Sequence, residues 1–283
     1  MTVRTLTAKL GPAAVVALVA AVYVFLLAPV VVVVAASFDG GEPVAGRAFL
    51  KFPPSELSLQ WYFEIQPRLF HALWVSFLVA ATAAIGGIVV GVPAALGLTR
   101  SNVPGKPLID ALFRAPLQIP FIVIGVAFLQ TYYLVGDQLG IRVAGSFVGL
   151  ALGHLFIAVP YVVGSVGAVL LRFNPSLEEA ALSLGASRWR TFRRVTVPII
   201  TPGIYAGALF AFMVSFGDVP ISLFLASPKY TTLPLEIFHS MEFDFDAAIL
   251  AISTLIVFAS LILLWIIQKV IGLDVLLRSG SSG

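Results

Sequence analysis

The amino-acid sequence predicts an all-α membrane protein with six transmembrane helices. Of its 283 residues, 59% are hydrophobic and only 11% are charged, whereas a soluble domain carries about 25% charged residues. The mean hydropathy of +1.03 is too high for every apolar side chain to be hidden inside one protein core. The apolar residues also gather in six long stretches that polar segments separate. Together these observations place much of the chain in lipid.

Each apolar stretch is long enough for a helix to cross about 30 Å of hydrocarbon, at about 1.5 Å per residue. None alternates between polar and apolar residues as a half-buried strand would. The first stretch follows Arg4 and Lys9, as in a signal peptide, but it is longer than the usual apolar region of about 7–15 residues. We therefore expect an uncleaved anchor. The predicted spans are residues 13–37, 70–98, 112–135, 146–171, 202–226 and 247–271.

The basic residues predict the orientation of these spans. Twelve of the 17 Lys and Arg residues lie near the two termini and in the connections near 99–114 and 172–201, and five lie in the other connections. Because cytoplasmic connections carry the excess of basic residues, both termini are expected in the cytoplasm. The predicted organisation is a cytoplasmic amino terminus (1–12), a six-span transmembrane domain (13–271) and a cytoplasmic tail (272–283). The last five residues of the tail resemble a linker or an expression remnant.

Three pairs of glycines occur at a spacing of four residues within the predicted spans. Small residues at this spacing let helices approach closely in lipid. We therefore expect close helix packing at Gly87 and Gly91, at Gly149 and Gly153, and at Gly203 and Gly207.

The sequence lacks the residues and patterns that several kinds of site and function require. There is no cysteine, so disulfides, thiolate metal sites and cysteine nucleophiles are impossible. The phosphate-binding pattern G-x-x-x-x-G-K-[ST] is absent, and Gly105-Lys106, which precedes Pro107, is expected to form a turn. The basic residues are interspersed with apolar runs instead of forming one solvated patch, so nucleic-acid binding is not expected. No catalytic set or ligand-spaced histidine cluster is present, so we predict neither an enzyme nor a cofactor on this chain.

The connection over residues 174–202 reads NPSLEEAALSLGASRWRTFRRVTVPIITP and is predicted to fold. Asn174 followed by Pro175 is a favourable helix start, and Ser176 with Glu179 offers a capping box as the alternative start. Either start places acidic residues at the positive end of a short helix, where they are stabilising.

Gly185 is expected to end this first helix, and Ser187 to cap a second one. Such a basic amphipathic helix would lie along the inner membrane surface, after which Pro198 and Pro202 would turn the chain into the fifth span. On physical grounds alone, a docking surface and a basic membrane anchor are equally well supported. The second helix carries Trp189, Phe192 and Val195 at spacings of three, together with Arg188, Arg190, Arg193 and Arg194.

The spacing within this connection is similar to that of the EAA loop of ABC importer permeases. The motif is carried by Glu179-Ala180-Ala181, Gly185 and Pro198, with Val195 and Val197 where the family has aliphatic residues. Its position before the last two of six spans also fits, and the resemblance extends from about the second span to the sixth. The expected ATPase-coupling residues are therefore Glu179, Ala180, Ala181, Gly185 and Pro198.

Within this family the chain most resembles the spermidine/putrescine-type permeases. The stretch Ser215–Ser222 is similar to their fifth span, and Thr231–Leu235 is similar to the loop that follows it. Gly217-Asp218 stands where those permeases usually have two adjacent acids, which is a departure from the polyamine pattern.

The resemblance implies a type I importer in the bacterial inner membrane. Two permease subunits, which are copies or homologues, would form one pathway. Two ATPase subunits, which carry ATP and Mg²⁺, would each grip an EAA loop, and a solute-binding protein would deliver cargo from outside. The expected cargo is a polyamine or a similar small organic cation. The alternatives are ferric iron, thiamine, an amino acid derivative or a phosphonate.

Asp218 is the only acid inside a predicted span. It lies about 22 Å into the fifth predicted helix, where an unpaired charge would be costly. Pro220 leaves the carbonyl of Phe216 without its usual donor, and a broken helix at membrane depth is tolerated where it lines a cavity. We therefore expect Phe216, Asp218 and Ser222 to line a translocation path. Alternatively, Asp218 pairs with a residue of the partner permease.

Two further side chains have open interpretations. His154 lies inside the fourth predicted span, where a hydrogen bond to a neighbouring helix is the more common role of a lone histidine. Tyr132 could offer an aromatic face to a cationic solute or belong to the interfacial aromatic belt. At the level of the whole protein, the rival functions are an ion-coupled secondary transporter, which would need no ATPase, and a membrane scaffold without a transport path.

Overall fold

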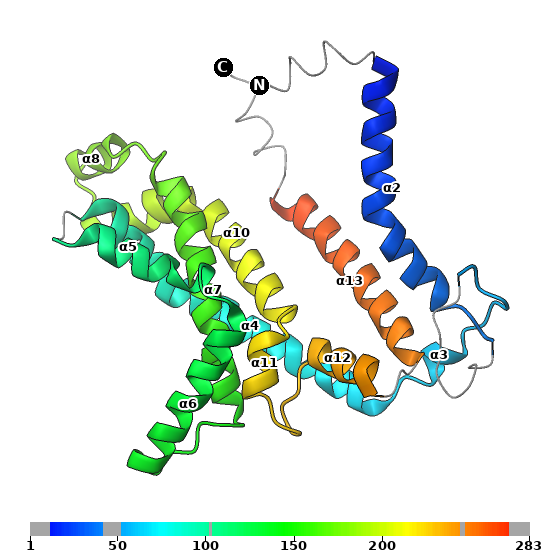
Figure 1. Cartoon of the computed structure of the whole chain (residues 1–283). Helices are drawn as coiled ribbons and strands as arrows, with labels where there is room; N and C mark the ends of the chain where they lie inside the picture. The colour runs from blue at the N-terminus through cyan, green and yellow to red at the C-terminus, as the bar shows by residue number, and fades with distance from the viewer. Residues whose placement is uncertain (1–11, 42–51, 102–103, 244–246, 272–283) are drawn as a thin grey trace. The chain divides into compact units, whose positions relative to one another are not determined.

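The computed structural model describes residues 12–41, 52–101, 104–243 and 247–271. The described chain is helical and divides into two compact units (Figure 1). The first unit is formed by the described parts of Met1–Pro67 and Ser240–Gly283, and the second unit by Arg68–His239. The predicted tail at 272–283 and most of the predicted amino terminus lie outside the described residues.

The first unit contains α2 (Pro12–Ala36), α3 (Gln60–Phe63) and α13 (Ala248–Ile271), and α13 contacts both of the others. The chain leaving α2 is tied down locally, because Asp39 Oδ1 accepts hydrogen bonds from the Ser55 amide and hydroxyl, each at 2.8 Å. The Trp61 indole donates to the Asp39 carbonyl at 2.7 Å. The apolar side chains of α2 are mostly exposed, with Phe25 at 77%, as expected of a helix that lipid surrounds.

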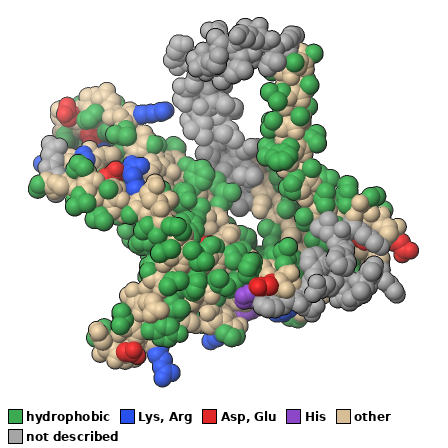
Figure 2. All heavy atoms as spheres, in the orientation of Figure 1, with side chains coloured by type: hydrophobic (Ala, Val, Ile, Leu, Met, Phe, Trp, Pro, Cys, Tyr) green, Lys and Arg blue, Asp and Glu red, His purple; other side chains and the backbone are tan. Residues whose placement is uncertain are grey.

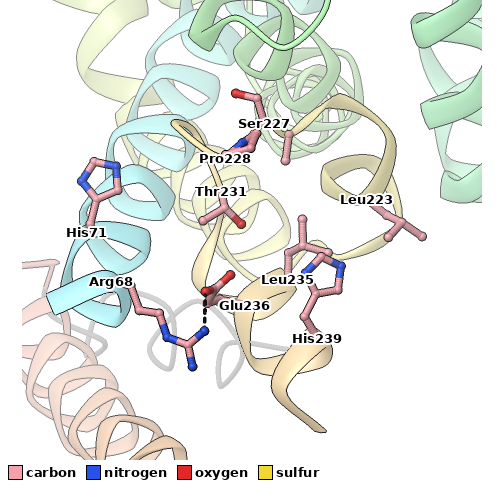
Figure 3. A pocket seen from close by; sticks show the side chains of 10 residues that line it. Arg68, His71, Leu223, Ser227, Pro228, Thr231, Leu235, Glu236 and His239 are labelled. Carbon is pink, nitrogen blue, oxygen red and sulfur yellow. Dashed lines mark hydrogen bonds and ion pairs between the residues drawn. The ribbon is translucent and has the colours of Figure 1, made fainter. Parts of the chain in front are cut away.

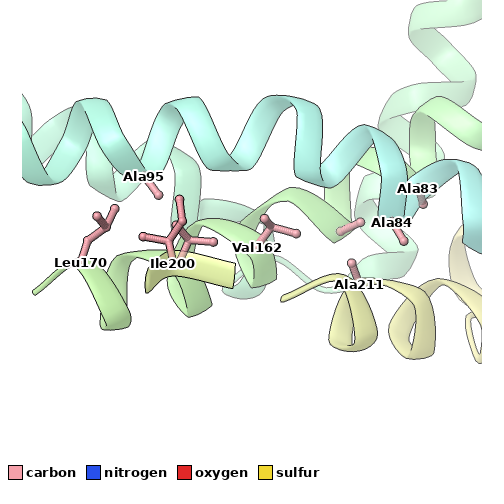
Figure 4. Close-up of a cluster of buried hydrophobic side chains, with 9 residues drawn as sticks. Ala83, Ala84, Ala95, Val162, Leu170, Ile200 and Ala211 are labelled. Carbon is pink, nitrogen blue, oxygen red and sulfur yellow. The ribbon is translucent and has the colours of Figure 1, made fainter. Parts of the chain in front are cut away.

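The second unit is built around α4 (Pro67–Arg100), α7 (Phe147–Leu170) and α10 (Val197–Phe216). Their apolar side chains interlock in one buried cluster, which Figure 4 shows between the three helices. A second buried cluster joins α4 and α7 to α6 (Phe121–Leu139) and α11 (Pro220–Leu225). The first cluster is formed by Ala83, Ala84, Ala95, Ala158, Val162, Val166, Leu170, Ile200 and Ala211.

Glycine permits the closest approach between α7 and α10. A Cβ atom at Gly207 would lie 2.8 Å from Cα of Val162, and one at Gly203 would lie 2.9 Å from the carbonyl oxygen of Ser165. On the other side, a Cβ at Gly91 of α4 would lie 2.9 Å from Cβ of Val162. The close packing that the glycine spacing predicts is therefore confirmed at these positions.

Among the described residues, five helices are long and apolar enough to span a membrane: Ala13–Ala36, Pro67–Arg100, Phe121–Leu139, Phe147–Leu170 and Arg188–Phe216. In α13 the qualifying apolar stretch, Ala248–Ile262, is shorter. Five of the six predicted spans are therefore matched by such helices, and the sixth stays a prediction. In Figure 2 charged side chains are visible over α5 and α8, near the lower end of α6 and around the connection between α11 and α12, with apolar side chains over much of the surface between them.

The third predicted span, 112–135, begins too early. The structure has a separate short helix, α5 (Lys106–Arg114), a single 3₁₀ turn (Ala115–Leu117), and then α6 from Phe121. Pro120 lacks an amide donor and disfavours helical backbone in the residue before it, so the two helices cannot merge. Gly105, with φ of +79°, precedes α5 and confirms the predicted turn.

The fifth predicted span, 202–226, is also misplaced. Helix continues from α9 (Arg188–Thr191) through a π-helical segment (Phe192–Thr196) into α10, and it ends at Phe216. Pro198 therefore does not turn the chain, as predicted, but lies inside this long helix. A proline there removes one backbone hydrogen bond and crowds the preceding turn, and the wider π turn accommodates that disruption.

Candidate functional site

The short helix predicted in the 174–202 connection is present as α8 (Ser176–Ser183). The Asn174 side chain accepts a hydrogen bond from the Ser176 amide at 3.1 Å, so the helix begins as the Asn174-Pro175 alternative predicts. The Ser176 side chain makes no cap at this end. Glu178 and Glu179 lie in the first turn, where carboxylates interact favourably with the helix dipole.

Gly185 ends α8 in the left-handed conformation, with φ of +84°. Its amide donates to the Leu182 carbonyl at 2.9 Å, and the Ala186 amide donates to the Ala181 carbonyl at 3.1 Å. This pair of bonds is the Schellman motif, which turns the chain sharply and satisfies the last carbonyls of a helix. The predicted role of Gly185 as the helix stop is confirmed.

The outer surface of α8 is uncovered. No residue of α8 is buried, Glu179 and Ala180 are exposed, and Ala181 is partly exposed. Leu184, just after the helix, is 90% exposed. Carboxylate and leucine side chains on one small element form a surface that is partly apolar and partly charged, as partner-binding surfaces commonly are.

The turn after Gly185 leads directly into the long helix of α9 and α10. The Ser187 hydroxyl accepts from the Arg190 amide at 3.4 Å and caps α9, as predicted. The Trp189 and Phe192 rings stack with centroids 5.7 Å apart. Pro198 is exposed within the same helix. The predicted coupling residues therefore lie on α8, on its terminal turn and on the helix that follows.

Glu178, which the sequence interpretation did not single out, attaches α8 to the rest of the second unit. Its Oε1 atom accepts a hydrogen bond from Arg100 Nη2 at 2.9 Å and another from the Thr196 hydroxyl. The adjacent acids at 178 and 179 are a signal of a helix start. The partners of Glu178 could not be found from the sequence, because Arg100 is 78 residues away.

The helix break predicted near Asp218 is present. Helix α10 ends at Phe216, and α11 begins at Pro220. The Asp218 Oδ2 atom accepts from the amides of Ile221 and Ser222, each at 3.0 Å, so the carboxylate caps α11 in the manner of an N-cap residue. Asp218 therefore lies just outside a long helix, and not within one as the predicted boundaries placed it.

His154 connects α7 to both sides of this break. One ring nitrogen is 2.9 Å from the Ser215 hydroxyl at the end of α10, and the other is 3.1 Å from the Ser222 hydroxyl in α11. His154 and Ser222 are both 0% exposed, and Asp218 is 4% exposed. The predicted hydrogen bonding of His154 to a neighbouring helix is confirmed. The network holds the chain at the break in one position against α7.

The remaining predicted path residues, Phe216 and Tyr132, lie in different surroundings. Phe216 is partly exposed and stacks on Phe212 at 5.7 Å. Tyr132 is 6% exposed, its ring packs edge-on against Phe128, and its hydroxyl donates to the Gly149 carbonyl at 2.8 Å. Tyr132 thus supports the contact between α6 and α7 in this conformation. The structure brings Asp218 and Ser222 together but leaves Tyr132 in the core.

A pocket of about 460 Å³ lies between the start of α4 and the segment that joins α11 to α12 (Leu233–Phe243). Figure 3 shows Arg68 and Glu236 paired in its lining, with 3.4 Å between Nη1 and Oε1. The His71 ring is 3.0 Å from the Lys229 carbonyl oxygen. The Leu233 amide donates to the Ser76 hydroxyl at 2.8 Å, so the Thr231–Leu235 segment is folded against α4.

A family model described as the inner membrane component of binding-protein-dependent transport systems matches residues 87–275. The matched region contains α8, its glycine turn and the broken helix. The chain belongs to this family of permeases. As a member, it is a multi-pass inner membrane protein that works with ATPase and binding-protein partners and does not itself carry out catalysis.

Curated relatives of this permease transport different solutes. The sulfate transport system permease CysT of Salmonella typhimurium is 35% identical over 226 residues, which cover 76% of this chain and 81% of the relative. The putrescine permease PotI of Escherichia coli is 30% identical over 237 residues, which cover 83% and 82%. The spermidine/putrescine permease PotC of Escherichia coli is 28% identical over 245 residues, which cover 86% and 88%.

Solved structures support the permease fold. A bacterial ABC transporter involved in alginate import matches with a TM-score of 0.68 and 14% identity, covering 90% of this chain and 94% of that chain. The MetNI methionine transporter in an inward-facing conformation matches with a TM-score of 0.56 and 19% identity, covering 75% and 95%. The fold is that of the transmembrane domain of an ABC importer.

Proposed function

We propose that this permease forms half of the translocation path of an ATP-driven importer, together with a second permease subunit. Two ATPase subunits, which bind ATP and Mg²⁺, lie beneath the pair, and each docks on one α8. The observation that carries this proposal is the uncovered surface of α8, a folded element that one ion pair and one hydrogen bond join to two long helices. An ion-coupled transporter would have no use for such a surface.

The docking surface proposed for the ATPase consists of α8 and its glycine turn. Its exposed leucines, including Leu184 at 90% and Leu177 at 48%, gain free energy when a partner removes them from water. Glu179 is exposed beside them and is available for a basic residue of the partner. The membrane-anchor alternative, carried by the arginines of residues 188–194, accounts for the second helix but leaves α8 without a role.

The translocation path is proposed to run beside the break between α10 and α11. Phe216 is partly exposed there, and Asp218, two residues later, is buried. The Asp218 Oδ1 atom is buried and accepts no hydrogen bond from the described residues, so the carboxylate retains acceptor capacity for a cation. A direct contact with solute requires the break to open, because the carboxylate is buried in this conformation, with His154 Nε2 at 3.9 Å and the Ser222 hydroxyl at 3.5 Å from Oδ2.

A row of four aromatic rings, Trp74, Phe77, Phe212 and Phe216, supports an organic cation as the cargo. Successive rings lie 5.8, 5.8 and 5.7 Å apart along α4 and α10. Trp74 is 58% and Phe77 47% exposed, and such faces attract ammonium groups. Sulfate is the second candidate, because the relatives that carry sulfate reach 34–36% identity over at least 215 residues.

The test uses the permease in liposomes with its ATPase and binding protein, and it measures uptake of [¹⁴C]putrescine and [³⁵S]sulfate. ATP-dependent putrescine uptake is expected, and Phe77→Leu should lower it about fivefold. Phe63→Leu serves as the matched control, since Phe63 is 86% exposed and lies outside the aromatic row. ATP-dependent uptake of sulfate alone would refute the cation assignment. Uptake driven by an ion gradient without ATPase would refute the importer.

A further inference from the structure

We propose that Arg100 and Glu178 are positioning residues that transmit the movement of α8 to the membrane-spanning helices α4 and α10. This inference rests on the proposed function, in which an ATPase moves α8. The movement of α8 is proposed to pass to the other helices through these two side chains. Neither residue belongs to the predicted coupling set.

The geometry places one carboxylate oxygen at the meeting point of three elements. Glu178 lies in the first turn of α8, and its Oε1 atom accepts from Arg100, the last residue of α4, at 2.9 Å. The same Oε1 atom accepts from the hydroxyl of Thr196, which ends the π-helical segment before α10 and is 0% exposed. Hydrogen bonds to an ionised group are shorter and stronger than neutral ones.

Arg100 also contacts the chain that enters α8. Its guanidinium carbon lies 5.3 Å from the centroid of the Phe173 ring, and Phe173 belongs to the connection between α7 and α8. A planar guanidinium can stack on a ring while its nitrogen atoms bind a carboxylate, which a lysine ammonium cannot do as well. Arg100 therefore holds both the entry to α8 and its first turn.

These polar contacts matter because core packing does not hold α8. No residue of α8 is buried, whereas Thr196 is completely buried. Glu178 and Arg100 are themselves only partly exposed, with 21% and 37% of their side chains accessible. A displacement of α8 therefore reaches α4 and α10 through a short chain of directional contacts, which is the physical form that coupling between sites takes.

Without the Glu178 carboxylate, α8 would still dock but would move more independently of the two helices. The expected signature is a loss of coupling. ATP hydrolysis continues, while less solute is moved for each ATP. A residue that only stabilised the fold would instead lower the amount of assembled complex and leave the uptake per ATP of the remainder unchanged.

The experiment compares Glu178→Gln with Asp110→Asn in the complete complex in liposomes. Asp110 receives the same kind of arginine contact at 2.9 Å, from Arg114. Both residues lie within α5, so Asp110→Asn removes an ion pair that does not connect two helices and serves as the control. Uptake of [¹⁴C]putrescine and of [³⁵S]sulfate is measured together with ATP hydrolysis. We expect uptake per ATP to fall about tenfold for Glu178→Gln and to stay within about twofold of wild type for Asp110→Asn.

A charge exchange separates positioning from folding. Glu178→Arg combined with Arg100→Glu should recover part of the uptake per ATP that each single change removes. Wild-type coupling in Glu178→Gln, or an exchange no better than the single changes, would overturn the inference. Loss of the bound ATPase in Glu178→Gln would also overturn it, by assigning Glu178 to docking. A wild-type complex that retains no ATPase would overturn the proposed function as well. The wild-type result therefore separates a failure of the proposed function from a failure of this inference alone.

Discussion

Replacing Gly185 with valine tests whether the turn at the end of α8 is required for ATPase docking. Gly185 has φ of +84°, and a Cβ atom there would meet no atom within 4 Å. The cost therefore comes from the backbone alone. The left-handed conformation costs a residue with a Cβ atom about 1–2 kcal/mol. For a β-branched residue the cost is at or above the upper end of that range.

A cost of about 2 kcal/mol lowers the population of the native turn about thirtyfold relative to competing conformations. The turn contains both hydrogen bonds of the Schellman motif, from the Gly185 and Ala186 amides, so its loss alters the end of α8 and the exposed position of Leu184. The helices of the core clusters are not touched. We therefore expect the permease to fold and insert while its ATPase-binding surface is distorted.

The assay measures ATPase retained during purification and ATP hydrolysis stimulated by the loaded binding protein. Gly185→Asn is the matched control, because asparagine enters the left-handed region more readily than other non-glycine residues. The expected order of activity is wild type, then Asn, then Ala, then Val. A Gly185→Val complex that assembles and transports like wild type would refute the reasoning, since the turn would then be dispensable.

Three further predictions address orientation, the helix break and helix packing. With single cysteines in this cysteine-free chain, a membrane-impermeant thiol reagent on intact cells should label Ser55→Cys and spare Ser187→Cys; the reverse pattern would contradict the orientation. Asp218→Asn keeps the shape but weakens a charge-assisted cap by about 1 kcal/mol, so putrescine uptake should fall while ATPase binding persists; unchanged uptake would dismiss a required carboxylate. Gly207→Leu would place Cβ 2.8 Å from an α7 backbone atom and should destabilise the permease by about 1–3 kcal/mol in thermal unfolding. Gly164→Leu, where a Cβ meets nothing within 4 Å, should not, and equal losses would refute the packing argument.

Structural features that depend only on residues close together in the chain can be predicted from the sequence alone. The long apolar stretches predict spanning helices because lipid imposes a minimum length, and five of them are matched by helices of suitable length. The ends of α8 at Asn174 and Gly185 and the cap at Ser187 are predictable, because each depends on a residue and its near neighbours. The break before Pro220 follows from the same local rules.

At two other prolines the predicted helix boundaries were wrong, and the two errors were of opposite kinds. Pro120 separates α5 from α6, whereas Pro198 lies inside one long helix. A proline always removes a donor and crowds the preceding turn, and this effect ends the helix before Pro120, where the predicted span 112–135 was continuous, but not at Pro198, where a turn of the chain was predicted. At Pro198 the π-helical segment just before it accommodates the disruption, and Ile200, two residues later, is fully buried in the core cluster. That packing against α7 is a tertiary effect.

The sequence by itself therefore determined that this chain is a helical membrane permease with a folded element between its fourth and fifth spans. Hydrophobic length, capping and glycine turns act over a few residues, and they can be recognised wherever they occur. Only the tertiary structure decided which side chains meet. His154 is hydrogen-bonded to Ser215 and Ser222, which are 61 and 68 residues away in the chain. Glu178 pairs with Arg100, which is 78 residues away. Such pairings depend on how α4, α7 and α10 pack together, and no local pattern specifies them.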